Sequence, residues 1–231
     1  MSVVSPEQAF AAGYLPAVTG AWFNLVLLFA DAARSPLPGV LDAVRAETAR
    51  MRATSASVVD TVREAQGLAE LAGVTPPAPP RVPEQYFPWV EAIHRDLASA
   101  FTGSNQLALF RAGHVLGEVL CSWNLALGVI RLLMADPDAP AFVRQLESCR
   151  DDLLRLAAVS AALAVGAGPT EPALIAARRA VEALDWFALH EGDAAGWRAL
   201  GVQLQEKMGA LEHEVNVTRA RLRALAPLPE A

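Results

Sequence analysis

The sequence predicts an all-α protein of about six to seven helices, and three observations support this. Apolar residues make up 53% of the chain but aromatic residues only 6%, so alanine, leucine and valine must supply most of the core. Alanine and leucine favour helices, and runs of β-branched residues are few. No stretch alternates apolar and polar residues as a half-buried strand does. With 231 residues, the chain is long enough to bury a substantial core.

An internal repeat with an offset of 100 residues predicts how these helices are grouped. The segment 10–27 recurs at 110–127, where Phe, Ala, Gly, Asn and Leu return at the same spacing, and Trp22 is matched by Trp123, one position out of step. Such self-similarity indicates a duplicated helical unit. We therefore expect two pseudo-symmetric three-helix units, 1–102 and 103–200, and a C-terminal helical extension at 201–231, all within one compact domain.

Prolines, glycines and capping residues predict the helices of the first unit. Ser5-Pro6-Glu7 is typical of a helix start, and this helix should extend to about residue 33 with Pro16 inside it. A second helix is expected at 38–72, ended by Gly73. Prolines at 76–80 then predict a stiff extended connector, and a third helix follows at 83–101.

The same signals predict four helices in the second half, at 104–135, 139–165, 170–190 and 194–225. In the last of these, apolar residues mark a single face, which we expect to pack on its own domain: Met208, Leu211, Val215, Leu222 and Leu225.

Small residues recur every four positions in both copies of the repeat, at 13, 17 and 21 and at 113, 117 and 121. Rows of this kind allow two helices to approach closely. We expect the two repeated helices to cross at a pseudo-twofold axis, with Asn24 and Asn124 near it. An asparagine buried among apolar neighbours needs hydrogen-bond partners and commonly fixes the register of packing.

Charge and cysteine content restrict the classes of partner and compartment. The net charge of −6 opposes binding to nucleic acid, which requires a basic surface. Two cysteines are too few for a disulfide framework, and the first residues show no secretory signal, so a cytoplasmic location is expected. The uncharged stretch 8–30 is long enough to span a bilayer. Its counterpart carries Arg111, His114 and Glu118, which argues for a buried helix and against a membrane span.

His114 and Glu118 are the residues at which the second copy departs from the first. They lie four apart, on one face of a helix, where the first copy has Tyr14 and Val18. Such a pair could orient an imidazole for proton transfer. It could also supply two metal ligands. We favour the simpler interpretation, a histidine satisfied by its neighbour on a helix surface, because two ligands on one helix make no site alone.

Two further sequence patterns involve histidines. Glu91 and His94 have the Glu-x-x-His spacing of carboxylate-bridged dimetal bundles, but no second such motif occurs, so no metal and no other cofactor is expected. The segment 111–117 resembles the active-site helix of histidine phosphotransfer domains. In those domains a lysine follows the histidine, whereas here Gly117 and then Glu118 follow, and a carboxylate there would repel a phosphoryl group.

These observations favour a non-enzymatic helical protein that binds a protein partner or a second copy of itself through apolar helix faces. A small-molecule site between the two units is the alternative, lined by Trp22, Asn24, Trp123, Asn124 and His114. In that case His114 and Glu118 could be an acid–base pair. Membrane association through the first helix and a phosphotransfer bundle are lesser alternatives. The sequence contains no phosphate-binding glycine loop, nucleophile elbow or Cys–His zinc pattern.

Overall fold

The prediction of an all-α fold is confirmed. The computed structural model describes residues 4–101, 103–186, 189 and 192–225, and within these ranges it contains seven α-helices, two short 3₁₀ helices and no strand. The elements in chain order are α1 (Pro6–Ala32), α2 (Pro38–Leu71), η1 (Pro83–Gln85), α3 (Tyr86–Ala100), α4 (Ser104–Leu133), α5 (Pro140–Ala164), η2 (Gly168–Thr170), α6 (Glu171–Glu182) and α8 (Ala194–Arg223).

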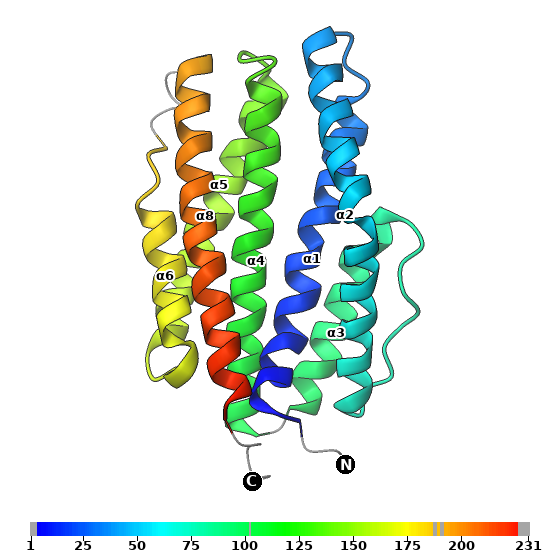
Figure 1. Ribbon diagram of the computed structural model, residues 1–231, viewed down its shortest axis with the longest axis vertical. Helices are drawn as coiled ribbons and strands as arrows, with labels where there is room; N and C mark the ends of the chain where they lie inside the picture. Colours follow the sequence, from blue (N-terminus) through cyan, green and yellow to red (C-terminus); the bar gives the residue numbers. More distant parts are fainter. Residues whose placement is uncertain (1–3, 102, 187–188, 190–191, 226–231) are drawn as a thin grey trace.

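Helices α1 and α4 form the centre of the bundle and run in the same direction (Figure 1). Helices α2 and α3 lie on one side of this pair, and α5, α6 and α8 lie on the other. Helix α3 is short and covers only one half of the bundle's length. The central pair therefore contacts helices from both halves of the chain.

Local sequence explains where α1 begins and how it continues past its proline. The Ser5 hydroxyl accepts a hydrogen bond from the Gln8 amide, and the Gln8 side chain accepts one from the Ser5 amide, which together form a capping box. Pro16 lies inside the helix and is buried. The Tyr86 hydroxyl donates to the Pro16 carbonyl oxygen at 2.7 Å, and this bond ties α3 to α1.

The expected close approach of the two repeated helices is present. A methyl group added at Gly13 would collide with the carbonyl oxygen of Phe110, and one added at Gly113 would collide with that of Phe10. At Gly117 it would lie 2.7 Å from the carbonyl oxygen of Tyr14. The backbones of α1 and α4 therefore touch at equivalent positions of the repeat. Pseudo-symmetry of the two complete three-helix units stays a prediction.

The sixth helix is shorter than expected. It was predicted to reach residue 190, but α6 ends at Glu182, and residues 187, 188 and 190 lie outside the described part of the chain. The backbone amide of Asp185 donates to the Gln203 side chain of α8 at 3.0 Å, so this segment is held by α8 instead of continuing the helical ladder. The unit boundary predicted at residue 200 falls inside α8.

The apolar face of α8 packs on the protein's own core, as predicted, through Leu211, Val215 and Leu222, which are buried, and Met208, which is partly buried. Leu225, the last residue of the predicted face, is exposed. At the end of α8, Arg219 donates two hydrogen bonds to Oε1 of Glu7 in the first turn of α1, at 2.9 and 2.8 Å. Because both side chains are largely buried, this contact joins the first and last helices of the bundle.

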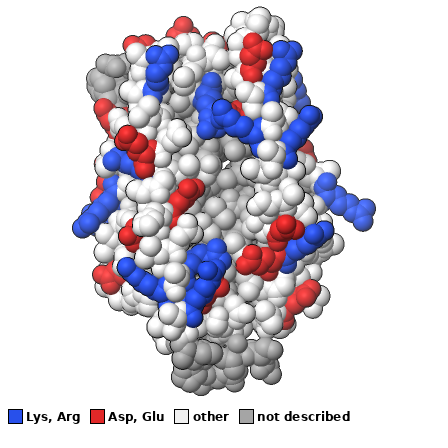
Figure 2. All heavy atoms as spheres, in the orientation of Figure 1, with Lys and Arg blue, Asp and Glu red and all other residues white. Residues whose placement is uncertain are grey.

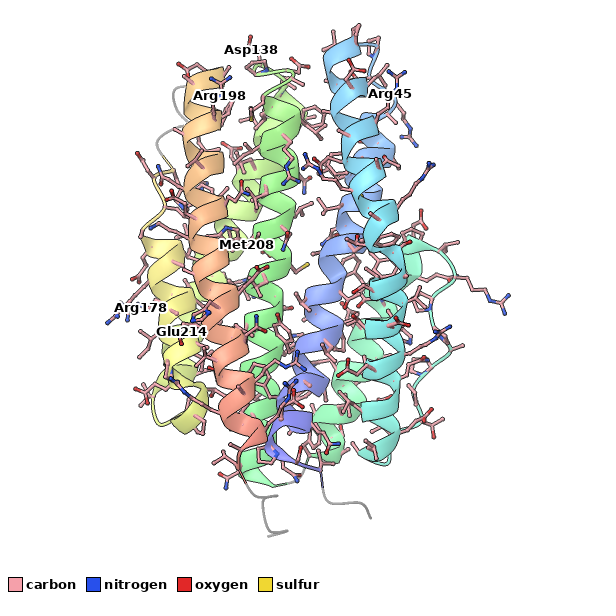
Figure 3. The ribbon with its side chains drawn as sticks, viewed as in Figure 1. Arg45, Asp138, Arg178, Arg198, Met208 and Glu214 are labelled. Carbon is pink, nitrogen blue, oxygen red and sulfur yellow. The ribbon has the colours of Figure 1, made fainter. Side chains whose placement is uncertain are left out.

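Charged side chains lie mainly on the outside, as Arg178 on the outer side of α6 illustrates (Figure 3). One face of the molecule is hollowed along its middle, with a mostly uncharged floor (Figure 2). By length and composition alone, α1 and residues 105–133 of α4 are apolar enough to cross a membrane, which is weak evidence. In α4, 72% of the apolar window is buried within the bundle, as in a core helix of a soluble protein, against 50% in α1.

Candidate functional site

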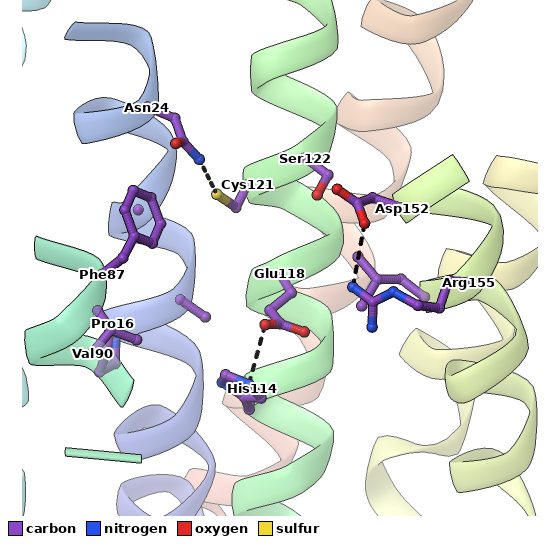
Figure 4. A pocket seen from close by; sticks show the side chains of 13 residues that line it. Pro16, Asn24, Phe87, Val90, His114, Glu118, Cys121, Ser122, Asp152 and Arg155 are labelled. Carbon is purple, nitrogen blue, oxygen red and sulfur yellow. Dashed lines mark hydrogen bonds and ion pairs between the residues drawn. The ribbon is translucent and has the colours of Figure 1, made fainter. Parts of the chain in front are cut away.

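A polar pocket of about 180 Å³ opens between α1, α3, α4 and α5, and we name it the histidine pocket (Figure 4). Its lining combines apolar walls with charged and polar groups: Pro16, Ala17, Gly20, Asn24, Phe87, Val90, His114, Glu118, Cys121, Ser122, Asp152, Arg155 and Leu156. The pocket brings together four charged or titratable side chains from α4 and α5, which are His114, Glu118, Asp152 and Arg155.

His114 and Glu118 contact each other as their spacing predicts. Nε2 of His114 lies 3.3 Å from Oε1 of Glu118, and the two side chains are 19% and 39% exposed. The ring of His94, from α3, lies against the His114 ring with centroids 4.0 Å apart. Three ionisable groups from two helices therefore adjoin one another at this edge of the pocket.

The charge states of these groups follow from their surroundings. Burial, and then the proximity of His114, lower the pKa of His94 to about 4, so its imidazole is neutral at pH 7. Burial alone would raise the pKa of Glu118, but the hydrogen bond and charge of His114 and the charge of Arg155 more than offset it. The net result is a pKa below the usual value, and Glu118 is a carboxylate at neutral pH.

Helix α5 supplies the opposite rim of the pocket. The guanidinium of Arg155 lies 3.6 Å from a carboxylate oxygen of Asp152, and both side chains are more than half exposed. Across the pocket, the Asn24 amide donates to the sulfur of Cys121 at 3.4 Å (Figure 4). Burial raises the pKa of the Cys121 thiol to about 12, so the sulfur is neither a nucleophile nor an anionic ligand at pH 7.

The arrangement is suited to hold a small organic molecule. A cavity of about 150 Å³ is large enough for benzene, so the histidine pocket has room for a compact ligand of similar size. No group of three or more His, Cys, Asp or Glu side chains within the described ranges is arranged to hold a metal ion. Glu91, the partner of His94 in the dimetal spacing, is exposed on α3.

The structure separates the residues that the sequence grouped into one ligand site. Asn24 and His114 line the histidine pocket, whereas Trp22 and Asn124 line a second hollow, between α1, α2 and α4. Trp123 is fully buried and donates its indole N–H to the Leu204 carbonyl at 2.8 Å, so it anchors α4 to α8. The reason for the separation is geometric, since successive residues of a helix point about 100° apart.

The sequence did not identify three residues that line the pocket, Phe87, Asp152 and Arg155, or the contact of the His94 ring with the ring of His114. Each is an ordinary residue on its own helix, and only the rotation of α3 and α5 about their axes brings these residues toward His114. His94 carried the one usable signal, because a histidine beside the apolar stripe of a helix is available for a partly buried contact.

Comparison with protein-family models, with curated proteins and with solved structures gives no match.

Proposed function

We propose that this chain is a non-enzymatic binding protein for a small organic amine, which it holds in the histidine pocket. The observation that carries the proposal is the pair of carboxylates in the lining. Glu118 contacts His114, Asp152 contacts Arg155, and His94 beside them is neutral at pH 7. An ammonium group would form a charge-assisted hydrogen bond with either carboxylate.

The remaining lining supports the same class of ligand. The ring of Phe87 offers an aromatic face, which attracts a cation, and the Asn24 carbonyl oxygen and the Ser122 hydroxyl are hydrogen-bond acceptors. The apolar side chains of Val90 and Leu156 would contact the hydrocarbon part of the ligand. A compact primary amine would satisfy both kinds of surface.

The state of His94 makes this residue a poor acid–base catalyst at pH 7. A general base works best when its pKa is near the working pH, and a pKa of about 4 makes His94 a weak base at pH 7. The Cys121 thiol, with its pKa of about 12, is no nucleophile either. We therefore assign His94 and Cys121 a role in the shape and polarity of the site and none in catalysis.

An NMR titration of the ¹⁵N-labelled full chain with n-butylammonium tests the proposal, with butyrate as the probe of equal size and opposite charge. We expect shifts at the amides of Asn24, His114 and Glu118 with the amine only. Glu118→Gln should weaken binding about tenfold, because it removes a charge-assisted hydrogen bond. Glu91→Gln, an exposed acid on α3, is the matched control and should change nothing. Equal shifts with butyrate would refute the proposal.

Self-association, which the sequence favours, is a second candidate, and one observation supports it. The second half of α1 carries six apolar side chains that are only partly buried: Trp22, Phe23, Leu25, Val26, Leu27 and Leu28. Leu27 is not packed against either cluster of buried apolar residues in the described part of the bundle. A second copy could cover this surface.

Light scattering over a concentration series tests self-association. If the surface joins two copies, the wild type is a dimer and Leu27→Glu is a monomer. Val59→Glu, which places the same charge at an exposed position on α2, should leave the dimer intact. A wild type that stays monomeric at high concentration would remove this candidate.

A further inference from the structure

The second hollow, between α1, α2 and α4, is larger than the histidine pocket and has a different lining. We name it the arginine groove. Its volume is about 410 Å³, within the usual range for ligand sites. It is lined by Leu15, Val18, Thr19, Ala21, Trp22, Leu25, Glu47, Arg50, Met51, Thr54, Ser57, Val58, Thr61, Asn124 and Arg131. The hollowed face in Figure 2 lies between α2 and the side formed by α4 and α8.

A cluster of three charges stands at one end of the groove. The Glu47 carboxylate is almost fully buried, and its two oxygens accept hydrogen bonds from Arg50 at 2.7 Å and from Arg131 at 2.8 Å. The cluster has a net charge of +1. Each guanidinium has five N–H donors and uses one of them on Glu47, and the described residues provide no partner for the others.

The buried carboxylate thus orients two arginines whose remaining donors are available for an anion. Arg131 is 37% exposed and Arg50 is 64% exposed, so both side chains are reachable from solvent. Two oxygens of a carboxylate, like those of a phosphate, match the fork of a guanidinium, and a monocarboxylate also carries the single negative charge that would neutralise the cluster.

The floor of the groove is apolar and leads away from the arginines. Leu15, Val18 and Trp22 contribute from α1, and Val58 contributes from α2. The Trp22 indole N–H is already satisfied, because it donates to the Met51 carbonyl oxygen at 3.3 Å. The ring is therefore fixed as an apolar wall. From position 50 to position 61 of α2 the groove extends about 16 Å, at 1.5 Å per helical residue.

We propose that the arginine groove binds a medium-chain aliphatic monocarboxylate. The carboxylate pairs with Arg50 and Arg131, and the hydrocarbon chain lies along Leu15, Val18, Trp22 and Val58. The site is separate from the histidine pocket and takes a ligand of the opposite charge, so the two can be tested independently.

Calorimetric titration of the full chain with sodium octanoate tests the assignment, with 1-octanol as the uncharged probe of equal chain length. We expect octanoate to bind about tenfold more tightly, which is the contribution of a charge-assisted hydrogen bond. From hexanoate to decanoate, each added methylene should raise the affinity about fourfold. Equal affinity for octanoate and octanol, or no measurable binding of octanoate, would overturn the proposal.

Two pairs of variants locate the bound molecule. Ser57→Trp fills the groove from an exposed lining position and should abolish binding, whereas Ala56→Trp, next to it but outside the lining, should not. Arg50→Gln should weaken octanoate about tenfold and leave octanol unchanged. Arg52→Gln, an exposed arginine on the same helix outside the lining, should leave both unchanged. Binding that survives in Ser57→Trp would place octanoate elsewhere and overturn the proposal.

Discussion

At the scale of single residues, His94 shows how the bundle controls charge. Its ring contacts the ring of His114, with centroids 4.0 Å apart, and the ring of Phe110, 5.1 Å away. A protonated imidazole would lose hydration there and would face a second histidine and Arg111, with only Glu118 opposing these effects. The neutral form is therefore the one that fits the native structure.

Acidification should destabilise the protein through this residue. The folded pKa of about 4 is below the ordinary value of 6.5, so between these pH values the unfolded chain binds more protons than the folded one. The His94 contribution is present in full above pH 6.5 and is lost as the pH falls toward 4. It amounts to on the order of 2 kcal/mol after solvent screening. Urea unfolding at pH 7, 5.5 and 4.5 measures it.

His94→Gln should flatten this pH dependence, because the glutamine cannot be protonated. His213→Gln, at an exposed position on α8, is the control and should keep the wild-type profile. If His94→Gln lost stability with falling pH as steeply as the wild type, another group would be responsible.

Side-chain contacts were predictable from the sequence only where both residues lie on the same helix. The His114–Glu118 contact follows from a spacing of four. Glu47 occupies a position in the buried face of α2 together with Val40, Val44 and Met51. A charged residue at such a position indicates a buried ion pair, so the sequence does contain a signal for this one. The contact of His94 with His114 and the position of Asp152 in the pocket lining depend on how separate helices are rotated, which spacing within one helix does not specify.

At the scale of elements, the contact between α1 and α4 depends on three glycines, Gly13, Gly113 and Gly117. Gly113→Ala should destabilise the protein by about 3 kcal/mol, because its methyl group would meet the Phe10 carbonyl oxygen and the two helices would have to separate. Gly209→Ala is the matched control. It lies in a helix with open space around it and should gain about 0.5–1 kcal/mol from helix propensity.

Urea denaturation followed by circular dichroism compares the two variants. A Gly113→Ala protein as stable as the wild type would mean that the helices can separate at little cost.

Element boundaries were predictable where a proline opened a helix. Helices α1, α2 and α5 each begin with a proline at the first helical position. Helices α1 and α2 begin where the sequence predicts, and α5 begins one residue later. The end of α6 was not predictable, because no glycine or proline marks residue 182 and the chain there is captured by Gln203 of α8. Tertiary contact overrides local propensity at such a point.

At the scale of the whole molecule, Glu7 and Arg219 join the first turn of α1 to the last turns of α8. Glu7→Gln should loosen this end of the bundle, because the charge that holds Arg219 and Arg223 is removed. Local opening of α8 should become easier by about 1–2 kcal/mol. Hydrogen exchange followed by mass spectrometry over residues 211–225 measures the change.

The comparison variant is Asp31→Asn, at an ion pair with Arg34 in which both side chains are well exposed. Such surface pairs contribute little, so exchange should be unaffected. Unchanged exchange in Glu7→Gln would show that apolar packing alone holds the end of α8.

The glycine contact between α1 and α4 also determines when the protein can fold during its synthesis. Its two sides are a hundred residues apart in the chain. Ribosomes add about 5–20 residues per second, so α1 waits for its central partner for about 5–20 s after it emerges. During that interval only α2 and α3 can cover its apolar surface. The chain must also lose the conformational entropy of closing a loop of about a hundred residues before the α1–α4 contact can stabilise the fold. Assembly of the bundle's centre is thus a late event on the nascent chain.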